Sequence, residues 1–332
     1  MDNNENLFYQ QEYYFWSAIC ANTVKISNQT SAYFSELPLP IFNYIYLHQG
    51  ALISDYEKAE ALFKQQAKPY ALVVHDQILS LFESEIITRR LVFDGESTAM
   101  ILPQGALSQY NSPPPLNTDF QIIQSNDRLE DWAQPLITAF PVDFDTDESD
   151  STVTDEYIRY HQRALDKQTN MVHLVLFADQ QPVSTLTMTF NNETARLDDI
   201  GTDIQYQGKG LATSLIKHAL YLCHQQGIKQ CVLESSSEGL SIYKKLGFEP
   251  IFNYYSYIWR DFIECILIIK MHFTLPKKIR FNVITNRKTA PSDTIMGINI
   301  MITPSIFILS PFGTNVEYLS QFVQCASAHL YL

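Results

Sequence analysis

The most regular alternation of apolar and polar positions in this chain lies between residues 211 and 227. Apolar side chains recur there at helical spacing, which places them on one face of an α-helix: Leu211, Ala212, Leu215, Ile216, Ala219, Leu220 and Cys223. Gly227 follows them and is a typical residue at a helix C-terminus. The pattern predicts an amphipathic helix whose apolar face packs on a core.

Short apolar runs on both sides of this helix predict β-strands. They cover residues 173–178, 183–190 and 195–202 before the helix, and residues 229–234 and 252–259 after it. A further short helix is predicted over residues 238–246. Ser235, Ser236 and Ser237 are its candidate N-cap residues, and Gly247 follows its end.

The loop that enters the amphipathic helix reads Gln207-Gly208-Lys209-Gly210-Leu211-Ala212. Its small residues expose backbone N–H groups at a helix N-terminus, where the helix dipole adds partial positive charge. Lys209 adds a full charge. We therefore expect a phosphorylated small molecule to bind here, although such a sequence also forms ordinary tight turns.

Two common phosphate loops are excluded by the neighbouring residues. A P-loop requires a hydroxyl residue directly after the lysine, and here Gly210 follows Lys209. A dinucleotide-binding loop would have its third glycine at position 213, which is Thr213.

The loop resembles a known family once the downstream residues are included. Gln207-x-x-Gly210-x-Ala212, followed by Tyr243-x-x-Leu246-Gly247-Phe248, is similar to the core of the GNAT acyltransferases. The resemblance covers roughly residues 118–260, with residues 120–124 as the first strand and residues 129–140 and 154–165 as the first two helices. It implies an α/β fold with a mixed sheet. It also implies transfer of an acetyl group from acetyl-CoA to a primary amine in a ternary complex, without a metal.

The resemblance also assigns roles to individual residues. The pyrophosphate of acetyl-CoA would lie on Gln207, Gly208, Lys209, Gly210, Leu211 and Ala212. Ile200 and Thr202 lie on the strand that separates from its neighbour and runs along the pantetheine arm, where a backbone N–H would stabilise the oxyanion. Ser236 stands where many members have an asparagine that touches the cofactor. Tyr243 is the candidate acid for the departing thiolate.

The sequence identifies the general base less clearly than it identifies the cofactor-binding residues. Asp198 and Asp199 are consecutive on the same strand, so alternation predicts that they face opposite sides of the sheet. We expect Asp198 to share a face with Ile200 and Thr202 and to act as the base, with a purely structural carboxylate as the alternative. His161 and His173 are further candidates, and the acidic loop 143–150 could attract a cation or simply be solvated.

The Ser236 variant of the motif resembles a subset of the family that carries a degenerate half-domain in front. Residues 38–102 fit such a half-domain without a phosphate loop, and an unrelated small α/β domain is the alternative. The sequence thus predicts a degenerate domain over 1–112, a proline-rich linker over 113–117, a catalytic domain over 118–260 and an extension over 261–332 with no assigned function.

The composition limits the classes of molecule that we expect the protein to bind. The net charge of −13 argues against a nucleic-acid partner and is compatible with a cationic amine. The acidic start, the lack of an apolar run of roughly eighteen residues and an odd number of cysteines without metal spacing predict a cytoplasmic protein with no membrane partner. A homodimer is compatible with these features. The alternative function is a catalytically idle GNAT-fold module that binds acyl-CoA as a sensor or interaction partner.

Overall fold

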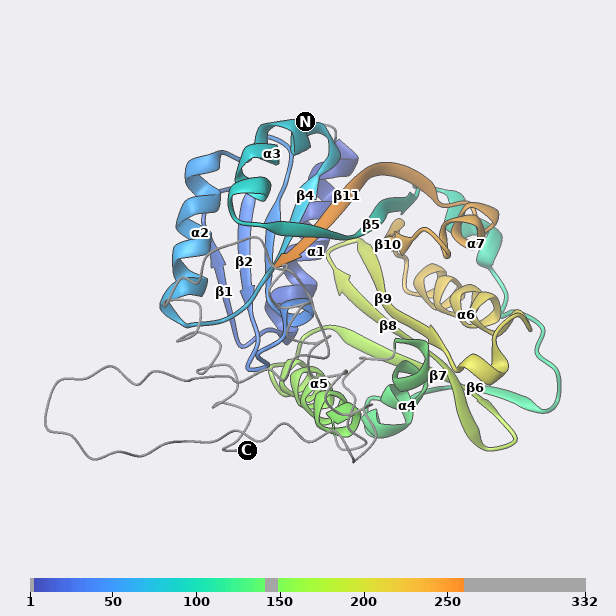
Figure 1. Ribbon diagram of the computed structural model, residues 1–332. Helices are drawn as coiled ribbons and strands as arrows, with labels where there is room; N and C mark the ends of the chain where they lie inside the picture. The colour runs from blue at the N-terminus through green and yellow to red at the C-terminus, as the bar shows by residue number, and fades with distance from the viewer. Residues whose placement is uncertain (1–2, 141–148, 260–332) are drawn as a thin grey trace, which may run out of the picture. The chain divides into compact units, whose positions relative to one another are not determined.

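The computed structural model describes residues 3–140 and 149–259, which belong to one compact unit, Met1–Thr274. The described strands form a single mixed sheet of 11 strands in the order β1-β2-β3-β4-β11-β5-β10-β9-β8-β7-β6 (Figure 1). The protein therefore has the mixed α/β fold that the sequence predicts. The predicted extension 261–332 and most of the acidic loop lie outside the described residues.

The elements fall into two halves. The amino-terminal half, residues 3–102, contains α1 (Asn3–Ile19), β1 (Asn22–Lys25), β2 (Thr30–Phe34), the short 3₁₀ helix η1 (Pro40–Phe42), β3 (Tyr44–Leu47), α2 (Ile53–Gln65), β4 (Ala71–His75), α3 (Leu79–Thr88) and β5 (Leu91–Leu102). The carboxyl-terminal half, residues 120–259, contains β6 (Phe120–Gln124), α4 (Leu129–Ala139), α5 (Ser149–Asp166), β7 (Met171–Ala178), β8 (Gln181–Asn191), β9 (Thr194–Thr202), α6 (Leu211–Gln225), β10 (Gln230–Ser236), α7 (Leu240–Lys245) and β11 (Glu249–Trp259).

Both halves repeat one order of elements. Three antiparallel strands are followed by a helix, a strand parallel to the third, a short helix and a last strand: β1, β2, β3, α2, β4, α3 and β5 in one half, and β7, β8, β9, α6, β10, α7 and β11 in the other. This internal repeat of topology agrees with the expectation of a half-domain in front of the catalytic one.

The two last strands are exchanged between the halves. β5 pairs with β10, β11 pairs with β4, and β5 and β11 pair with each other at the centre of the sheet. The two halves therefore share one sheet in space. That residues 113–117 are a linker between two domains stays a prediction. Local sequence patterns predict these strands but contain no signal for which partner each strand takes.

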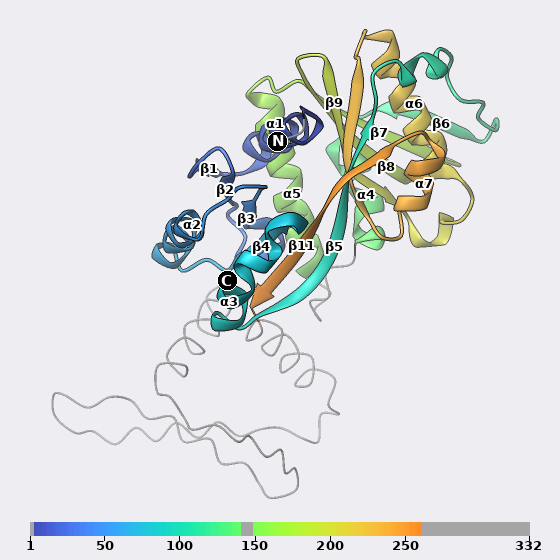
Figure 2. The same cartoon turned by 90° about the horizontal axis from the view of Figure 1, so that it is seen from above.

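Helices cover both faces of the sheet. The apolar face of α6 packs on one face, against residues of β8, β9 and β10 such as Met188, Leu197 and Leu233. On the opposite face, α1 and α5 lie beside each other, as Figure 2 shows. They share a core cluster that includes Phe8, Phe15 and Tyr160. None of the helices in the described parts of the chain is long and apolar enough to cross a membrane.

Most predicted elements are confirmed, one begins later than predicted, and α1, β1, β2 and β3 were not predicted. The predicted helix over 238–246 begins later, at Leu240, because β10 continues to Ser236, and Gly239 is its N-cap without a side-chain cap bond. The serine cluster therefore does not cap the helix as expected. Helix α1 was not predicted, since tyrosines on several of its sides obscure a helical period.

Candidate active site

The loop before α6 is open and rich in free amides. Gly208 (φ 74°) and Gly210 (φ 78°) adopt left-handed conformations that other residues rarely adopt, and a Cβ on either would meet no atom within 4 Å. Among the described residues, no hydrogen-bond acceptor lies against the N–H groups from Gly208 to Ala212. The loop therefore presents a cluster of unpaired donors toward solvent at the N-terminus of α6, which suits an anion.

Two side chains attach this loop to its surroundings. The Gln207 side-chain amide donates a hydrogen bond to the carbonyl of Thr202, 3.1 Å away, which fixes the loop to the end of β9. The Lys209 ammonium lies 4.6 Å from the centre of the Tyr206 ring, so the loop carries a cation in a defined place.

Next to the loop, β9 and β10 separate. Their parallel pairing begins at Thr194 opposite Gln230 and ends at Leu197 opposite Leu233. β9 continues to Thr202 with pairing only to β8. The edge of β9 that faced β10 is therefore left without a strand partner beyond Leu197, and Ile200 and Thr202 lie on this segment, as predicted.

The expectation that Asp198 and Asp199 face opposite sides of the sheet is wrong. Asp199 has a left-handed backbone (φ 51°), and the pairing of β8 with β9 shifts register at this point, which together mark a β-bulge. Asp198 accepts from the Arg196 guanidinium at 2.9 Å, while Asp199 accepts from the Tyr157 hydroxyl of α5 at 2.6 Å. Both carboxylates thus lie on the α1/α5 face.

The same bulge separates Asp198 from the residues that were expected to share its face. Ile200 packs against the core cluster beneath α6, on the opposite side of the sheet. A strict period of two fails here because a bulge inserts one extra residue into β9.

Burial changes the acidity of both carboxyls. It raises the pKa of Asp198 to about 7, with the Arg196 charge opposing the shift, and raises the pKa of Asp199 to about 6, with the Tyr157 hydrogen bond opposing it. Each group therefore changes protonation close to neutral pH, as an acid–base catalyst requires.

Tyr243 lies on α7 with only 9% of its surface exposed. A Cβ added at Gly239 would lie 2.8 Å from its ring, so the ring occupies the space that the glycine leaves. Burial, with a smaller contribution from the Asp198 charge, raises the pKa of Tyr243 to about 12, which keeps the phenol protonated. Ser236 is exposed at the end of β10, and its hydroxyl accepts from the N–H of Gly239 at 3.3 Å.

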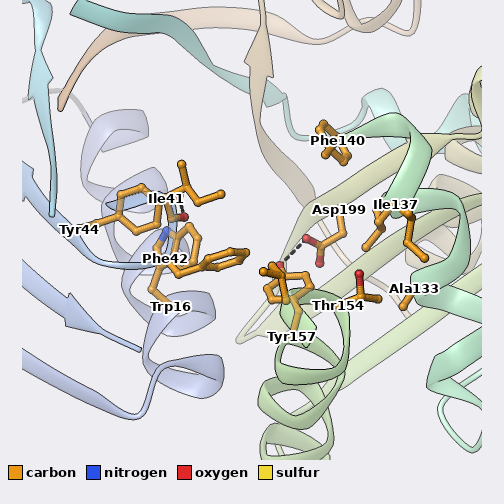
Figure 3. Close-up of a pocket in the computed structure, with 12 residues that line it drawn as sticks. Trp16, Ile41, Phe42, Tyr44, Ala133, Ile137, Phe140, Thr154, Tyr157 and Asp199 are labelled. Atoms are coloured by element: carbon orange, nitrogen blue, oxygen red, sulfur yellow. Dashed lines mark hydrogen bonds between the residues drawn. The ribbon is translucent and has the colours of Figure 1, made fainter. Parts of the chain in front are cut away.

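A pocket of about 310 Å³ opens on the α1/α5 face, with Asp199 as the carboxylate among its lining residues (Figure 3). The carboxyl-terminal half contributes Ala133, Leu136, Ile137, Phe140, Val153, Thr154 and Tyr157, and the amino-terminal half contributes Trp16, Ile41, Phe42 and Tyr44. Sequence reasoning missed these aromatic residues, since they carry no motif and come together only through the fold. The high content of Trp, Phe and Tyr in the segments that supply them is the one sequence signal that could have suggested an aromatic pocket.

Comparison with known proteins agrees with this geometry. Residues 144–257 match the family model described as the acetyltransferase (GNAT) domain. The chain is similar to a GCN5-related N-acetyltransferase from Kribbella flavida, at 11% identity and a TM-score of 0.54 over 77% of this chain and 95% of that one. It is also similar to a conserved protein of unknown function from Staphylococcus epidermidis, at 16% identity and a TM-score of 0.52 over 72% and 93% of the two chains. No curated protein matches the sequence.

Residues 144–257 thus carry a match to the acetyltransferase (GNAT) domain, and the chain shares the fold of these structures.

Proposed function

We propose that this protein transfers an acetyl group from acetyl-CoA to a primary amine by direct attack in a ternary complex. The observation that carries the proposal is the unpaired amide cluster at the start of α6, which lies next to the separated edge of β9. In a GNAT domain, this arrangement offers one continuous surface for a pyrophosphate and its extended arm.

The residues around the loop fit this cosubstrate. The N–H groups of Gln207 to Ala212 would hold the pyrophosphate with the Lys209 charge, and the backbone at Ile200 and Thr202 would pair with the amide groups of the pantetheine arm. Ser236 lies at the end of the opposing strand β10, where its exposed hydroxyl can contact the same arm.

Two side chains supply the proton transfers. Tyr243 would donate a proton to the sulfur as the thiolate leaves, because its raised pKa keeps it protonated at neutral pH. The sequence favours Asp198 as the base, and that role stays a prediction. Because Asp198 is bound to Arg196 and Asp199 lines the pocket, we assign removal of the amine proton to Asp199.

The pocket walls favour one class of amine. Among the described residues that line the pocket, aromatic and aliphatic side chains surround the Asp199 carboxylate, so this part of the site suits a monoamine with an apolar or aromatic body better than a polyamine. A second cation would have no carboxylate partner among these described lining residues.

The test is calorimetric titration of acetyl-CoA into the wild type, Gly210→Glu and Gly227→Glu. Gly227 is a matched control, because it has a similar φ (73°) and open space but lies past the other end of α6. We expect Gly210→Glu to weaken binding by at least about tenfold and Gly227→Glu to change it by less than about twofold.

A second measurement separates the enzyme from an idle binding module. Release of free thiol from acetyl-CoA is followed with 2-phenylethylamine and with spermidine. Faster release with 2-phenylethylamine supports the enzyme and its acceptor class. Binding of acetyl-CoA without release by any amine in a wider panel would support the idle module, and no binding would overturn both readings.

A further inference from the structure

Next to the Asp199 carboxylate lies a row of buried polar side chains that have no role in the proposed reaction as described above. His161 on α5 and His173 on β7 have no exposed surface, and their rings are joined by a hydrogen bond of 2.8 Å between Nδ1 of His161 and Nε2 of His173. His161 Nε2 lies 3.7 Å from Asp199 Oδ2, and His173 Nδ1 lies 3.2 Å from Asn126 Oδ1. The four residues thus form one row from Asn126 to Asp199.

The orientation of the Asn126 side-chain amide determines which ring nitrogens of His173 and His161 carry a proton. Its amide nitrogen donates to the Met171 carbonyl at 2.9 Å, so its oxygen points to His173 and accepts the backbone N–H of that residue at 2.8 Å. Because Asn126 Oδ1 can only accept, Nδ1 of His173 carries a proton. Burial lowers the pKa of His173 to about 3, so the ring is neutral and its Nε2 has a lone pair.

The same logic continues to His161. Since His173 Nε2 is an acceptor, His161 Nδ1 must be the donor in the bond between the rings. Burial and the neighbouring His173 lower the pKa of His161 well below its usual value, so this ring is also neutral and its Nε2 bears a lone pair. That lone pair points toward a carboxylate oxygen.

Two acceptors therefore face each other without a proton between them. Asp199 Oδ2 and His161 Nε2 are both buried and have no hydrogen-bond partner among the described residues, whereas Asp199 Oδ1 is occupied by the Tyr157 hydroxyl. Buried polar atoms without partners are costly, so the pair gains a hydrogen bond when one proton arrives.

We infer that Asp199 and His161 jointly accept the proton that the acceptor amine loses, and that His173 and Asn126 are positioning residues that hold His161 in the accepting tautomer. The inference rests on the proposed function for the source of the proton. An N–H bond of the ammonium breaks, an O–H bond forms on Asp199 and donates to His161 Nε2, and the nitrogen keeps the electron pair for attack on the thioester. As the C–S bond then breaks, Tyr243 protonates the sulfur, and the second proton of the attacking nitrogen restores the phenol. The pair changes from a net charge of −1 to zero and returns its proton to solvent after transfer.

Groups from the neighbouring elements face the pair. α5 contributes Tyr157, β8 contributes the Thr187 hydroxyl, and β9 contributes Asp198 and Arg196. Trp132 of α4 and Phe15 of α1 cover the His161 ring without a titratable group.

NMR of the wild type tests the arrangement without cofactor or turnover, with nitrogen-15 labels observed at the histidine rings and carbon-13 labels observed at the aspartate carboxyls. We expect His161 and His173 to be protonated at Nδ1 and to stay neutral, and we expect one titration near pH 6 to appear both at His161 Nε2 and at the Asp199 carboxyl. A His161 protonated at Nε2 throughout this range, or an Asp199 that titrates without any change at His161, overturns the inference. Neither outcome bears on acetyl-CoA binding, which the calorimetry tests separately.

His161→Phe is the kinetic test, and His218→Phe on α6 is its matched control, since His218 lies outside this row. Phenylalanine has no acceptor, so protonated Asp199 loses its partner and the acidic limb of the pH profile of kcat/KM moves to lower pH. The rate at neutral pH should fall by about 10²-fold. An unchanged limb in His161→Phe would show that Asp199 works without His161.

Discussion

At the scale of single residues, the site depends on ionisable groups that are removed from water. Asp198, Asp199 and Tyr243 all have raised pKa values, and burial is the largest cause for each. In the proposed reaction, this one cause has two consequences: it raises the pKa values of the carboxyls toward neutral pH, which suits a proton acceptor, and it keeps the phenol protonated, which suits a donor.

Tyr243→Phe tests the donor. Because only the hydroxyl is removed, we expect kcat to fall by about 10²-fold, while the affinity for acetyl-CoA stays within about twofold. The measurement is thiol release over a range of acetyl-CoA concentrations. An unchanged kcat would mean that water or another group protonates the thiolate.

At the scale of elements, two local irregularities place the site residues. The bulge at Asp199 turns two consecutive carboxylates to one face, and the N-cap position of α7 is a glycine, Gly239, where the Tyr243 ring leaves no room for a side chain. Gly239 has φ −74°, so its requirement is steric and not conformational.

Gly239→Ala is therefore expected to act through Tyr243. The methyl group displaces the ring, and kcat should fall by about tenfold or more with little change in the affinity for acetyl-CoA. Gly95→Ala is the control, since a Cβ there meets nothing within 4 Å.

The double variant Gly239→Ala/Tyr243→Phe tests whether the glycine acts through the Tyr243 hydroxyl. If Gly239→Ala acts only through the phenol, adding it to Tyr243→Phe should cost little more than Tyr243→Phe alone. Fully additive losses would indicate that the glycine serves the loop itself.

At the scale of the whole molecule, the exchange of β5 and β11 joins the two halves through buried side chains. Tyr254, on β11, donates to Glu12 of α1 at 3.3 Å and lies 2.7 Å from His48 Nδ1, and Tyr33 donates to Glu12 at 2.8 Å. Although Glu12 and His48 are only 3.6 Å apart, they do not form an ion pair, because burial lowers the pKa of His48 to about 3.

Glu12 makes the stability of the molecule depend on pH. Burial raises its pKa to about 8, above the value of about 4.3 for an unfolded chain, so folding takes up a proton between these values. The free energy of unfolding should fall as pH rises from 5 to 8, by about 1.4 kcal/mol per pH unit from this group. Glu12→Gln removes that contribution.

Urea unfolding followed by tryptophan fluorescence at several pH values measures this difference. The wild type should lose stability with rising pH more steeply than Glu12→Gln. Parallel curves for the two proteins would mean that Glu12 takes up no proton on folding.

The local parts of the protein could be predicted from its sequence: the loop at Gln207–Ala212, helix α6, the Tyr243 segment and most strands. These follow from patterns within a few residues, such as helical spacing and glycines at a helix start, and the backbone obeys them wherever the segment lies. Four features arise only when the chain is folded: the bulge at Asp199, the exchanged strands, the aromatic pocket and the row from Asn126 to Asp199. Each depends on strand register or on side chains that are far apart in sequence, and such pairings are selected by the packing of the whole sheet and not by any local pattern.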